Sequence, residues 1–333
     1  MSRTFKATGI NLKAMPLGEA DQILTILTPD LGLIRAVVPG SRKHQSRLGG
    51  RSDLFVINDW LVAKGKHLDK VVQAETARTF PKLSQDLGRL TTSQYLAEIV
   101  LFMALNDGSQ TELYHLFVEH LERIETSPPS ALLAALTHGL YHLLALAGVA
   151  PEVHRCCLSR EEIVPNLMDA AWTVGFSPEA GGLVQWSAFN QGQAPHRPRP
   201  KNRPASVSAL FLDPLDSGSL TTESPTAESS TSEVFSPDDQ DTRFLRETIG
   251  SYRGHTPVPQ SLNAMEVVLL QQLSKPEIIT TRPVLPDALA ATASSTQSLL
   301  WARIERLLRH YAQDYFERPI RSAALIDVCF ATG

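Results

Sequence analysis

Five short runs of β-branched and apolar residues fill the first eighty residues of the chain, and they restrict its fold more than any other feature. Turn-forming Pro, Gly and Asp residues punctuate the segment between the runs. The runs cover residues 5–12, 23–27, 31–38, 54–63 and 71–77. Because no crossover helix fits between them, a small barrel is favoured over βαβ units. The five-stranded OB-fold, a frequent binder of single-stranded nucleic acids, fits this count.

A cationic loop, residues 40–51, lies between the third and fourth runs and holds four Lys/Arg and three Gly residues. Such a loop can present charge to a phosphate backbone, or it can serve solubility alone. Residues 1–80 carry twelve Lys/Arg against seven Asp/Glu, a net charge of +5. The whole chain carries −4, so the remainder carries −9. A basic module before an acidic remainder indicates a polyanionic partner.

The candidate DNA-binding residues are the cations of this loop, of the run that leads into it, and of the turn after the fourth run. They are Arg35, Arg42, Lys43, Arg47, Arg51, Lys64 and Lys66. Each would neutralise phosphate without reading sequence. Phe55 and Trp60 could stack on bases, but they alternate with polar residues as buried strand positions do, which favours core packing.

Helices are predicted from about residue 82 onward. Capping-box spacing at Thr91 and Gln94 predicts a first helix that ends near Gly108, and the same spacing at Ser109 and Glu112 predicts a second. A third helix is predicted to begin at 127–129 and to end at Gly148. Residues 151–190 appear in no periodic pattern and are read as irregular. Apolar helical runs follow at 262–273, 299–315 and 322–328. Short turns between the first three helices predict an antiparallel bundle.

Residues 191–261 differ in composition from the rest of the chain. A Pro-rich basic stretch comes first, and residues 205–241 then carry eight acids, many serines and no Lys or Arg. Such a segment cannot bury enough apolar surface to offset its ordering entropy. The predicted architecture is therefore α+β: a nucleic-acid-binding OB-fold at 1–80, a helical domain at 81–190 and 262–333, and a disordered acidic insertion at 191–261.

No sequence pattern of a catalytic site is present. The P-loop, nucleophile-elbow and zincin motifs are missing from the sequence, so an enzyme is not expected. The four histidines on the predicted second and third helices are read as structural: His115, His120, His138 and His142. No cofactor is expected.

The three cysteines, Cys156, Cys157 and Cys329, are too few and too unevenly spaced for a disulfide framework, which favours a reducing compartment. The adjacent pair lies close to His154, but no second cysteine pair follows, so buried thiols are favoured over a zinc site. The N-terminus lacks a signal-peptide pattern, and the apolar stretches are read as too short to span a membrane. A soluble, cytoplasmic protein is expected.

Several segments together resemble the bacterial recombination mediator family RecO. They are ATGINL at 7–12, LGEADQILTILT at 17–28, LGLIRAVVPGSRK at 31–43, SRL at 46–48, QAE at 73–75, YLAEI at 95–99, and RS at 321–322 after a Tyr-rich helix. The likeness covers residues 1–150 well and residues 299–327 weakly. It implies an OB-fold followed by a helical domain, as the residues themselves predict.

The resemblance also implies an activity and partners. Members of the family bind single- and double-stranded DNA and anneal complementary strands. With RecR, and often RecF, they load RecA onto DNA coated by single-strand-binding protein (SSB). An apolar and basic surface would receive the acidic C-terminal tail of SSB, and the protein would be associated with the nucleoid.

Many members of the family carry a zinc knuckle after the third helix, and this chain departs from it. Cys156 and Cys157 are at most a degenerate remnant, and Gln185 stands near an expected cysteine. No metal is therefore assigned. Two alternatives to a DNA-repair function stay open: an OB-fold RNA-binding or ribosome-associated protein, and a purely structural scaffold. Strand annealing distinguishes the first of these, since charge alone does not separate RNA from DNA.

Overall fold

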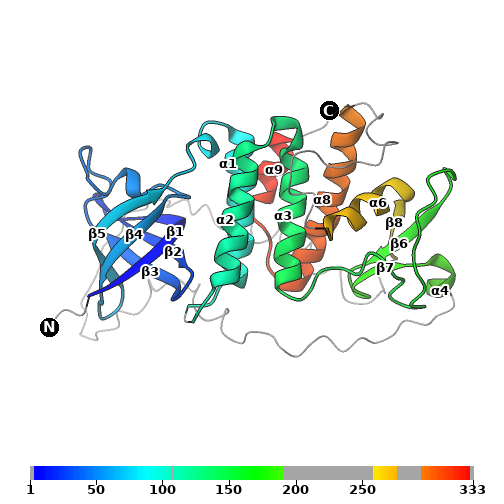
Figure 1. Cartoon of the computed structure of the whole chain (residues 1–333), viewed down its shortest axis with the longest axis horizontal. Coiled ribbons are helices and arrows are strands. Elements are labelled where there is room, and N and C mark those ends of the chain that lie inside the picture. The colour runs from blue at the N-terminus through cyan, green and yellow to red at the C-terminus, as the bar shows by residue number, and fades with distance from the viewer. Residues whose placement is uncertain (1–3, 107, 191–257, 276–293, 331–333) are drawn as a thin grey trace, which may run out of the picture. The chain divides into compact units, whose positions relative to one another are not determined.

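The computed structural model of the chain describes residues 4–106, 108–190, 258–275 and 294–330. Its N-terminal part is a closed barrel with the strand order β1-β2-β3-β5-β4 (Figure 1). The strands are β1 (Thr4–Leu17), β2 (Asp21–Thr28), β3 (Gly32–Val38), β4 (Ile57–Ala63) and β5 (Asp69–Arg78). A five-stranded barrel followed by helices confirms the predicted OB-fold and α+β class. Nearly all of the predicted acidic insertion, residues 191–257, lies outside the described residues.

Alternating side chains of the strands fill the barrel interior. The buried set comprises Leu24, Ile26, Ile34, Ala36, Val38, Trp60, Val62, Val71 and Ala74. Trp60 is only 2% exposed. Phe55, also 2% exposed, packs against Phe117 of the helical region with ring centroids 6.4 Å apart. Core packing of both aromatics is thus confirmed, and neither ring is available to stack on a base.

The barrel closes through a short seam between β3 and β5. Only two parallel residue pairs join these strands, Ala36 with Asp69 and Val37 with Lys70. Nearer the start of β3, the Leu33 N–H donates instead to the Leu105 carbonyl at 2.8 Å. Gly32 has φ +71°, and a Cβ there would lie 2.5 Å from that same carbonyl oxygen. The turn after the first helix therefore covers this edge of β3.

The helical region is built from both halves of the chain. Figure 1 shows the first three helices beside two helices from the C-terminal part. The helices are α1 (Leu87–Met103), α2 (Thr111–Thr126), α3 (Leu132–Leu146), α4 (Trp186–Asn190), α6 (Ala264–Leu273), α8 (Ser294–Phe316) and α9 (Ala323–Cys329). Their apolar faces share one core with Ile10, Leu12 and Ile57 of the barrel.

The capping-box prediction for the first helix is wrong. α1 begins at Leu87, five residues before the start that a Thr91 cap predicts, because the Asp86 carboxylate accepts the Arg89 N–H at 2.9 Å and caps the helix. Thr91 is buried inside the helix. The helix also ends at Met103, before the predicted stop at Gly108.

The second capping box is wrong as well, since α2 begins at Thr111 with no side-chain cap. The Ser109 hydroxyl instead donates to the Pro29 carbonyl at 3.2 Å. The third helix follows its prediction more closely. A 3₁₀ turn, Pro129–Ala131, precedes α3, and Gly148, with φ +72°, follows its C-terminus.

Among the described residues, one stretch, Pro129–Leu146, is long and apolar enough to span a membrane, with 18 residues at a mean hydropathy of 1.3. The expectation that no stretch reaches this length is therefore wrong. In the structure 67% of this segment is buried, which fits the central helix of a protein core. The segment includes α3, which packs against α1, α2 and α8.

Residues 151–190 contain regular structure, contrary to the irregular segment predicted. Strand β6 (Thr173–Ser177) pairs on one side with β7 (Gly182–Val184) and on the other with β8 (Gln260–Asn263). The tight connection between β6 and β7 uses Gly181 at φ +86°. This small sheet was missed because β8 lies far along the chain from the strand that it joins.

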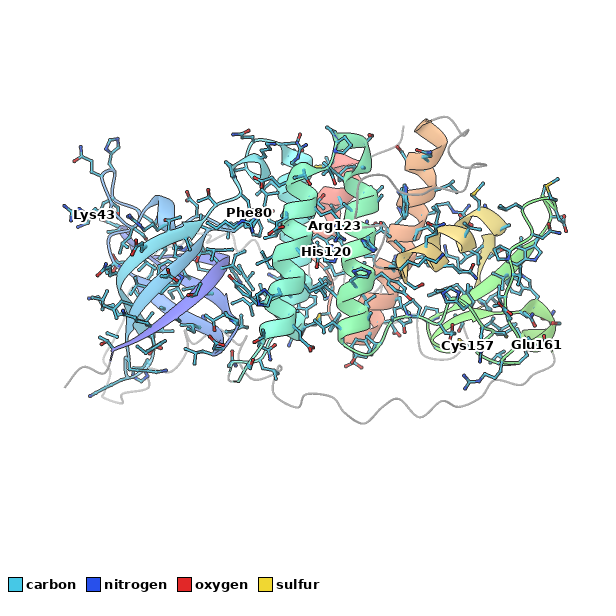
Figure 2. All side chains as sticks on the ribbon, in the orientation of Figure 1. Lys43, Phe80, His120, Arg123, Cys157 and Glu161 are labelled. Atoms are coloured by element: carbon cyan, nitrogen blue, oxygen red, sulfur yellow. The ribbon has the colours of Figure 1, made fainter. Side chains whose placement is uncertain are left out.

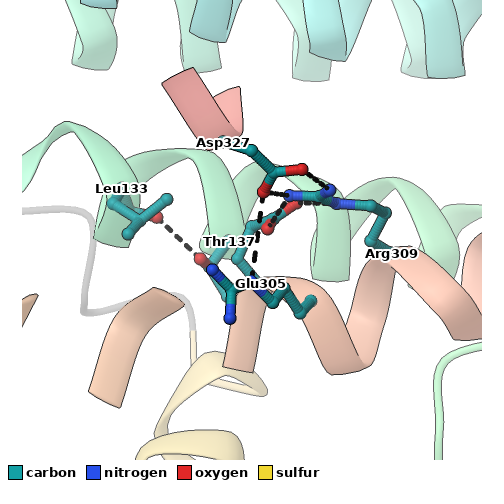
Figure 3. A network of polar contacts seen from close by, with 6 residues as sticks. Leu133, Thr137, Glu305, Arg309 and Asp327 are labelled. Atoms are coloured by element: carbon teal, nitrogen blue, oxygen red, sulfur yellow. Dashed lines mark hydrogen bonds and ion pairs between the residues drawn. The ribbon is translucent and has the colours of Figure 1, made fainter. Parts of the chain in front are cut away.

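A charge network of buried Arg309 and Glu305 with exposed Asp327 ties α9 to α8 (Figure 3). The Arg309 guanidinium donates to both carboxylate oxygens of Glu305, at 2.9 and 2.6 Å, and to both oxygens of Asp327, at 2.8 and 2.9 Å. Glu305 is only 1% exposed. Burial disfavours the charged guanidinium, but the hydrogen bonds to Asp327 and Glu305 outweigh it and raise the pKa of Arg309.

A second polar contact joins α9 to α1. The Glu98 carboxylate accepts the backbone N–H groups of Arg321 and Ser322, at 2.8 and 3.0 Å, and the Ser322 hydroxyl at 2.7 Å. These groups lie directly before α9, so Glu98 fixes the point at which that helix begins. Two of the sequence segments that carry the family resemblance, residues 95–99 and 321–322, thus meet in the fold.

Three histidines cluster between α2 and α3. The rings of His138 and His142 have centroids 3.9 Å apart, and the His120 ring lies 5.6 and 5.3 Å from them. The Arg123 guanidinium lies 2.8 Å from His138 Nδ1. Because a guanidinium can only donate, this nitrogen must accept, so His138 is neutral.

The protonation of these histidines is suppressed by their surroundings. Burial, followed by the charge of neighbouring His142 and Arg123, lowers the pKa of His138 to about 3. Burial and Arg123 lower the pKa of His142 to about 4. Contacts from the Lys275 and Leu273 carbonyls oppose these shifts. The Glu119 carboxylate pairs with Arg123 at 2.7 Å beside the cluster.

We expect the stability of the protein to fall as the pH is lowered below about 6.5, where unfolded histidines take up protons and the folded cluster does not. The slope should reach about 1.4 kcal/mol per pH unit for each suppressed histidine. Urea unfolding between pH 7.5 and 5 measures it. His142→Gln should flatten the slope, and His67→Gln, an exposed histidine, should not. Equal slopes in all three proteins would contradict this expectation.

Candidate nucleic-acid interface

The start of the cationic loop is fixed to the turn between β1 and β2. The Gly40 N–H donates to the Asp21 carboxylate at 2.7 Å, and Gly40 has φ +66°. The Arg42 N–H donates to the Ala20 carbonyl at 2.9 Å, and its guanidinium donates to the Gly18 carbonyl at 3.0 Å. The loop therefore leaves β3 in a defined direction.

The end of the loop is fixed by two buried asparagines of the barrel. The side-chain amides of Asn11 and Asn58 both donate to the Arg51 carbonyl, at 2.8 and 2.9 Å. Between the ends, successive backbone turns join Gly40 to Lys43 and then run on to Ser52. Hydrogen bonds thus order the loop along its length, so it is not a flexible connection between β3 and β4.

The four cations of the loop differ in their surroundings. Arg42, Lys43 and Arg47 are exposed, and Figure 2 shows Lys43 on the part of the loop that stands off the barrel. Arg51 is half-buried, and its guanidinium donates to the Arg47 carbonyl. None of the four forms an ion pair with a carboxylate in the part of the chain that the structure describes. Lys43 and Arg47 are free to meet phosphate, whereas Arg42 and Arg51 also support the loop through their bonds to the Gly18 and Arg47 carbonyls.

A second cationic group lines a pocket of about 470 Å³ beside the β3–β5 seam. Phe5, Leu33, Arg35, Lys64 and Asp69 are among its lining residues. The Lys64 ammonium lies 3.4 Å from the Asp69 carboxylate and 4.9 Å from the centre of the Phe5 ring. Asp69 therefore partly compensates the charge of Lys64. Arg35 lies exposed on β3.

The sequence-predicted residues thus fall into two groups. Arg35 and Lys64 share the pocket, and exposed Lys66 lies in the same turn as Lys64. Arg42, Lys43, Arg47 and Arg51 lie in the loop. No hydrogen bond or ion pair among the described residues joins one group to the other.

Lys70 is a candidate that sequence reasoning missed. It is exposed at the seam, where it pairs in register with Val37 of β3. The alternation of β5 could have placed it outward, but its position beside β3 depends on the barrel closing. Arg78 is not a candidate, because it forms an ion pair with Glu122 and lies over the Phe80 ring at 4.8 Å.

One surface of the barrel is unsuited to phosphate. Asp59 of β4 and Glu75 of β5 are direct cross-strand neighbours, and both are exposed. The Thr8 hydroxyl donates to Asp59 at 2.6 Å. Two adjacent carboxylates repel a polyanion, which leaves the loop and the pocket as the favourable surfaces.

A closed five-stranded barrel with exposed cations on a fixed loop places the chain among the OB-fold proteins, many of which bind nucleic acids. Residues 1–80 match the family model for the N-terminal part of Recombination protein O, and residues 84–199 match the model for its C-terminal part.

Full-length relatives agree with these matches. DNA repair protein RecO of Nostoc sp. is 42% identical over 100% of this chain and 98% of its own. The same protein is 44% identical in Acaryochloris marina, over 99% and 96%, and 44% identical in Gloeothece citriformis, over 98% of each chain. The chain belongs to the RecO family of DNA repair proteins.

Proposed function

We propose that the protein is a recombination mediator that binds single- and double-stranded DNA without sequence preference and anneals complementary strands. One observation carries the proposal. The loop at 40–51 presents Arg42, Lys43 and Arg47 without carboxylate partners among the described residues, on a backbone held by hydrogen bonds at both ends. Such cations bind phosphate and release counterions.

Annealing follows from this kind of contact. Two strands repel one another through their phosphates, and cations that neutralise phosphate lower the repulsion while leaving base edges free to pair. No catalytic group is needed, so the proposed role is not enzymatic. Further phosphate contacts along the DNA strand would come from Arg35, Lys64, Lys66 and Lys70.

The proposed partners rest on family membership. The protein would act with RecR, and with RecF, to load RecA onto DNA coated by SSB, and the acidic SSB tail would dock on the helical region. Association with the nucleoid follows from DNA binding.

The test is strand annealing with the full-length protein. Complementary oligonucleotides, one labelled with a donor and one with an acceptor fluorophore, are coated with SSB and mixed. We expect annealing to be at least tenfold faster with the protein than without it. Annealing at the rate seen without the protein, together with tight binding to RNA, would support the RNA-binding alternative. Failure to bind either polyanion would support a scaffold.

A further inference from the structure

A compact module after α3 has the backbone of a metal-binding knuckle. Within it the Ser159 N–H donates to the Cys156 Sγ at 3.4 Å, and the Arg160 N–H donates to the Cys156 carbonyl at 2.9 Å. Arg160 has φ +66°, an uncommon conformation for a residue with a side chain. The chain then returns, and the Cys156 N–H donates to the Glu161 carbonyl at 2.8 Å.

A second arm meets this turn at the same sulfur atom. Gln185, which follows β7, donates its N–H to the Cys156 Sγ at 3.3 Å. The Ser159 hydroxyl lies 3.3 Å from the Gln185 side-chain oxygen and donates to it. The Phe189 N–H donates to the Gln185 carbonyl at 3.0 Å, so the arm turns into α4 at this point.

The spacing of the two arms matches a zinc knuckle, in which each arm supplies two ligands three residues apart. The four corresponding positions are Cys156 and Ser159 on the first arm, and Gln185 and Ala188 on the second. One thiol, one hydroxyl, one amide and one methyl group do not make a zinc site. Among the described residues there is also no group of three His, Cys, Asp or Glu side chains that could hold a metal.

This geometry places only one of the two adjacent cysteines at a ligand position. Cys157 is buried, and its N–H donates to the Leu183 carbonyl at 2.8 Å, so its backbone belongs to the pairing between the two arms. The position equivalent to a second ligand on the first arm is Ser159, not Cys157.

We propose that this module is a metal-free knuckle, in which hydrogen bonds to the Cys156 sulfur and between Ser159 and Gln185 hold together the two arms that a zinc ion would otherwise join. The sulfur thus acts as a hydrogen-bond acceptor at the position of a ligand.

The chemistry of Cys156 agrees with this role. Burial raises the pKa of its thiol, but hydrogen bonds from Ser159, Gln185 and Leu158 outweigh burial, and the pKa is lowered. Several donors therefore converge on one sulfur, as they do on a metal-bound thiolate.

The rest of the module supplies attachments that need no metal. From α6, the Gln271 amide donates to the Val153 and Ile163 carbonyls at 2.9 and 3.0 Å. The Leu183 N–H donates to the Glu152 carbonyl at 2.9 Å, and Gly182 leaves no room for a Cβ, which would lie 2.2 Å from that carbonyl oxygen. Backbone pairing thus joins the two arms beside the sulfur, and α6 holds the two ends of the first arm.

The test is metal content and chelator sensitivity in the full-length protein, using zinc and cobalt(II) as probes. The wild type, purified with added zinc, should hold less than about a tenth of an equivalent, and its thermal midpoint should not move with a chelator. The variant Ser159→Cys, Gln185→Cys, Ala188→Cys should bind about one equivalent and show a cobalt–thiolate charge-transfer band. Its midpoint should fall when the chelator is added.

Two further variants keep the test decisive. Adding Cys157→Ser to the triple variant should leave its metal content unchanged, whereas adding Cys156→Ala should lower it. If the triple variant does not fold, two other measurements test the proposal. They are the metal content of the wild type and the thermal midpoint of Cys156→Ala made in the wild-type background. That single change should lower the thermal midpoint by about 2 to 4 °C, and Cys156→Ser should lower it less. A full equivalent of zinc in the wild type would overturn the proposal, as would a Cys156→Ala midpoint equal to the wild type.

Discussion

Replacing Arg42, Lys43, Arg47 and Arg51 together with glutamine should weaken single-strand binding by about two to three orders of magnitude at 0.1 M salt. Each phosphate contact to a single strand adds about −0.7 to the slope of log K against log salt. If about five cations engage, the slope of the wild type is about −3.5, and the variant should retain about −0.7. Fluorescence anisotropy with a labelled oligonucleotide, measured across a salt series, gives both quantities.

A matched control changes the same net charge elsewhere. Lys82, Arg155, Lys275 and Arg321 are exposed outside the barrel, and their replacement with glutamine should alter the slope by less than half as much. An unchanged slope and affinity in the loop variant would contradict the proposed interface. Arg51→Gln alone should reduce affinity through a looser loop, because its guanidinium holds the Arg47 carbonyl.

Arg309→Met should lower the free energy of unfolding by about 3 to 5 kcal/mol. This is the largest loss of stability that we expect from a single substitution. Glu305, 1% exposed, would be left in the core without the guanidinium that compensates it. Asp327 of α9 would also lose its two hydrogen bonds to α8. Urea unfolding followed by circular dichroism measures the loss.

Arg306 provides a nearby comparison on the same helix. It lies 3.9 Å from Asp327 and its side chain is 56% exposed, so Arg306→Met should change stability by less than about 1 kcal/mol. The double variant Arg309→Met, Glu305→Leu should recover most of the loss, because no unpaired charge remains buried. Equal losses in Arg309→Met and Arg306→Met would show that burial of Glu305 is not the cause.

The barrel could be predicted because its signals are local. Alternation, β-branched residues and turn residues identify each strand within a few positions, and five such strands in eighty residues leave few folds. The first residues of the helices were harder to predict from the sequence. A capping box is a two-residue pattern, and at Thr91 and Ser109 it occurs where Asp86 and the Pro29 carbonyl determine the local structure.

The knuckle sheet and the pocket depend on contacts between distant segments. Thr173 pairs with Asn263, and no local pattern connects them. The exposed cations of the loop could be recognised from composition and turn residues. Sequence could not reveal that Asp69 compensates Lys64, that Arg51 supports the loop, or that Lys70 lies beside β3. Each of these depends on how the barrel closes.

The contact between Glu98 and residues 321–322 also bears on how the chain is assembled. It spans more than two hundred residues of sequence, whereas every pairing of the barrel lies within the first eighty. During synthesis, the barrel and its cationic loop can therefore form while the ribosome is still making α2. Phe55 lacks its packing partner until Phe117 of α2 has been made. Glu98 of α1 lacks its partners until residues 321–322 have emerged. The nascent chain thus exposes its folded barrel well before the helical region is complete.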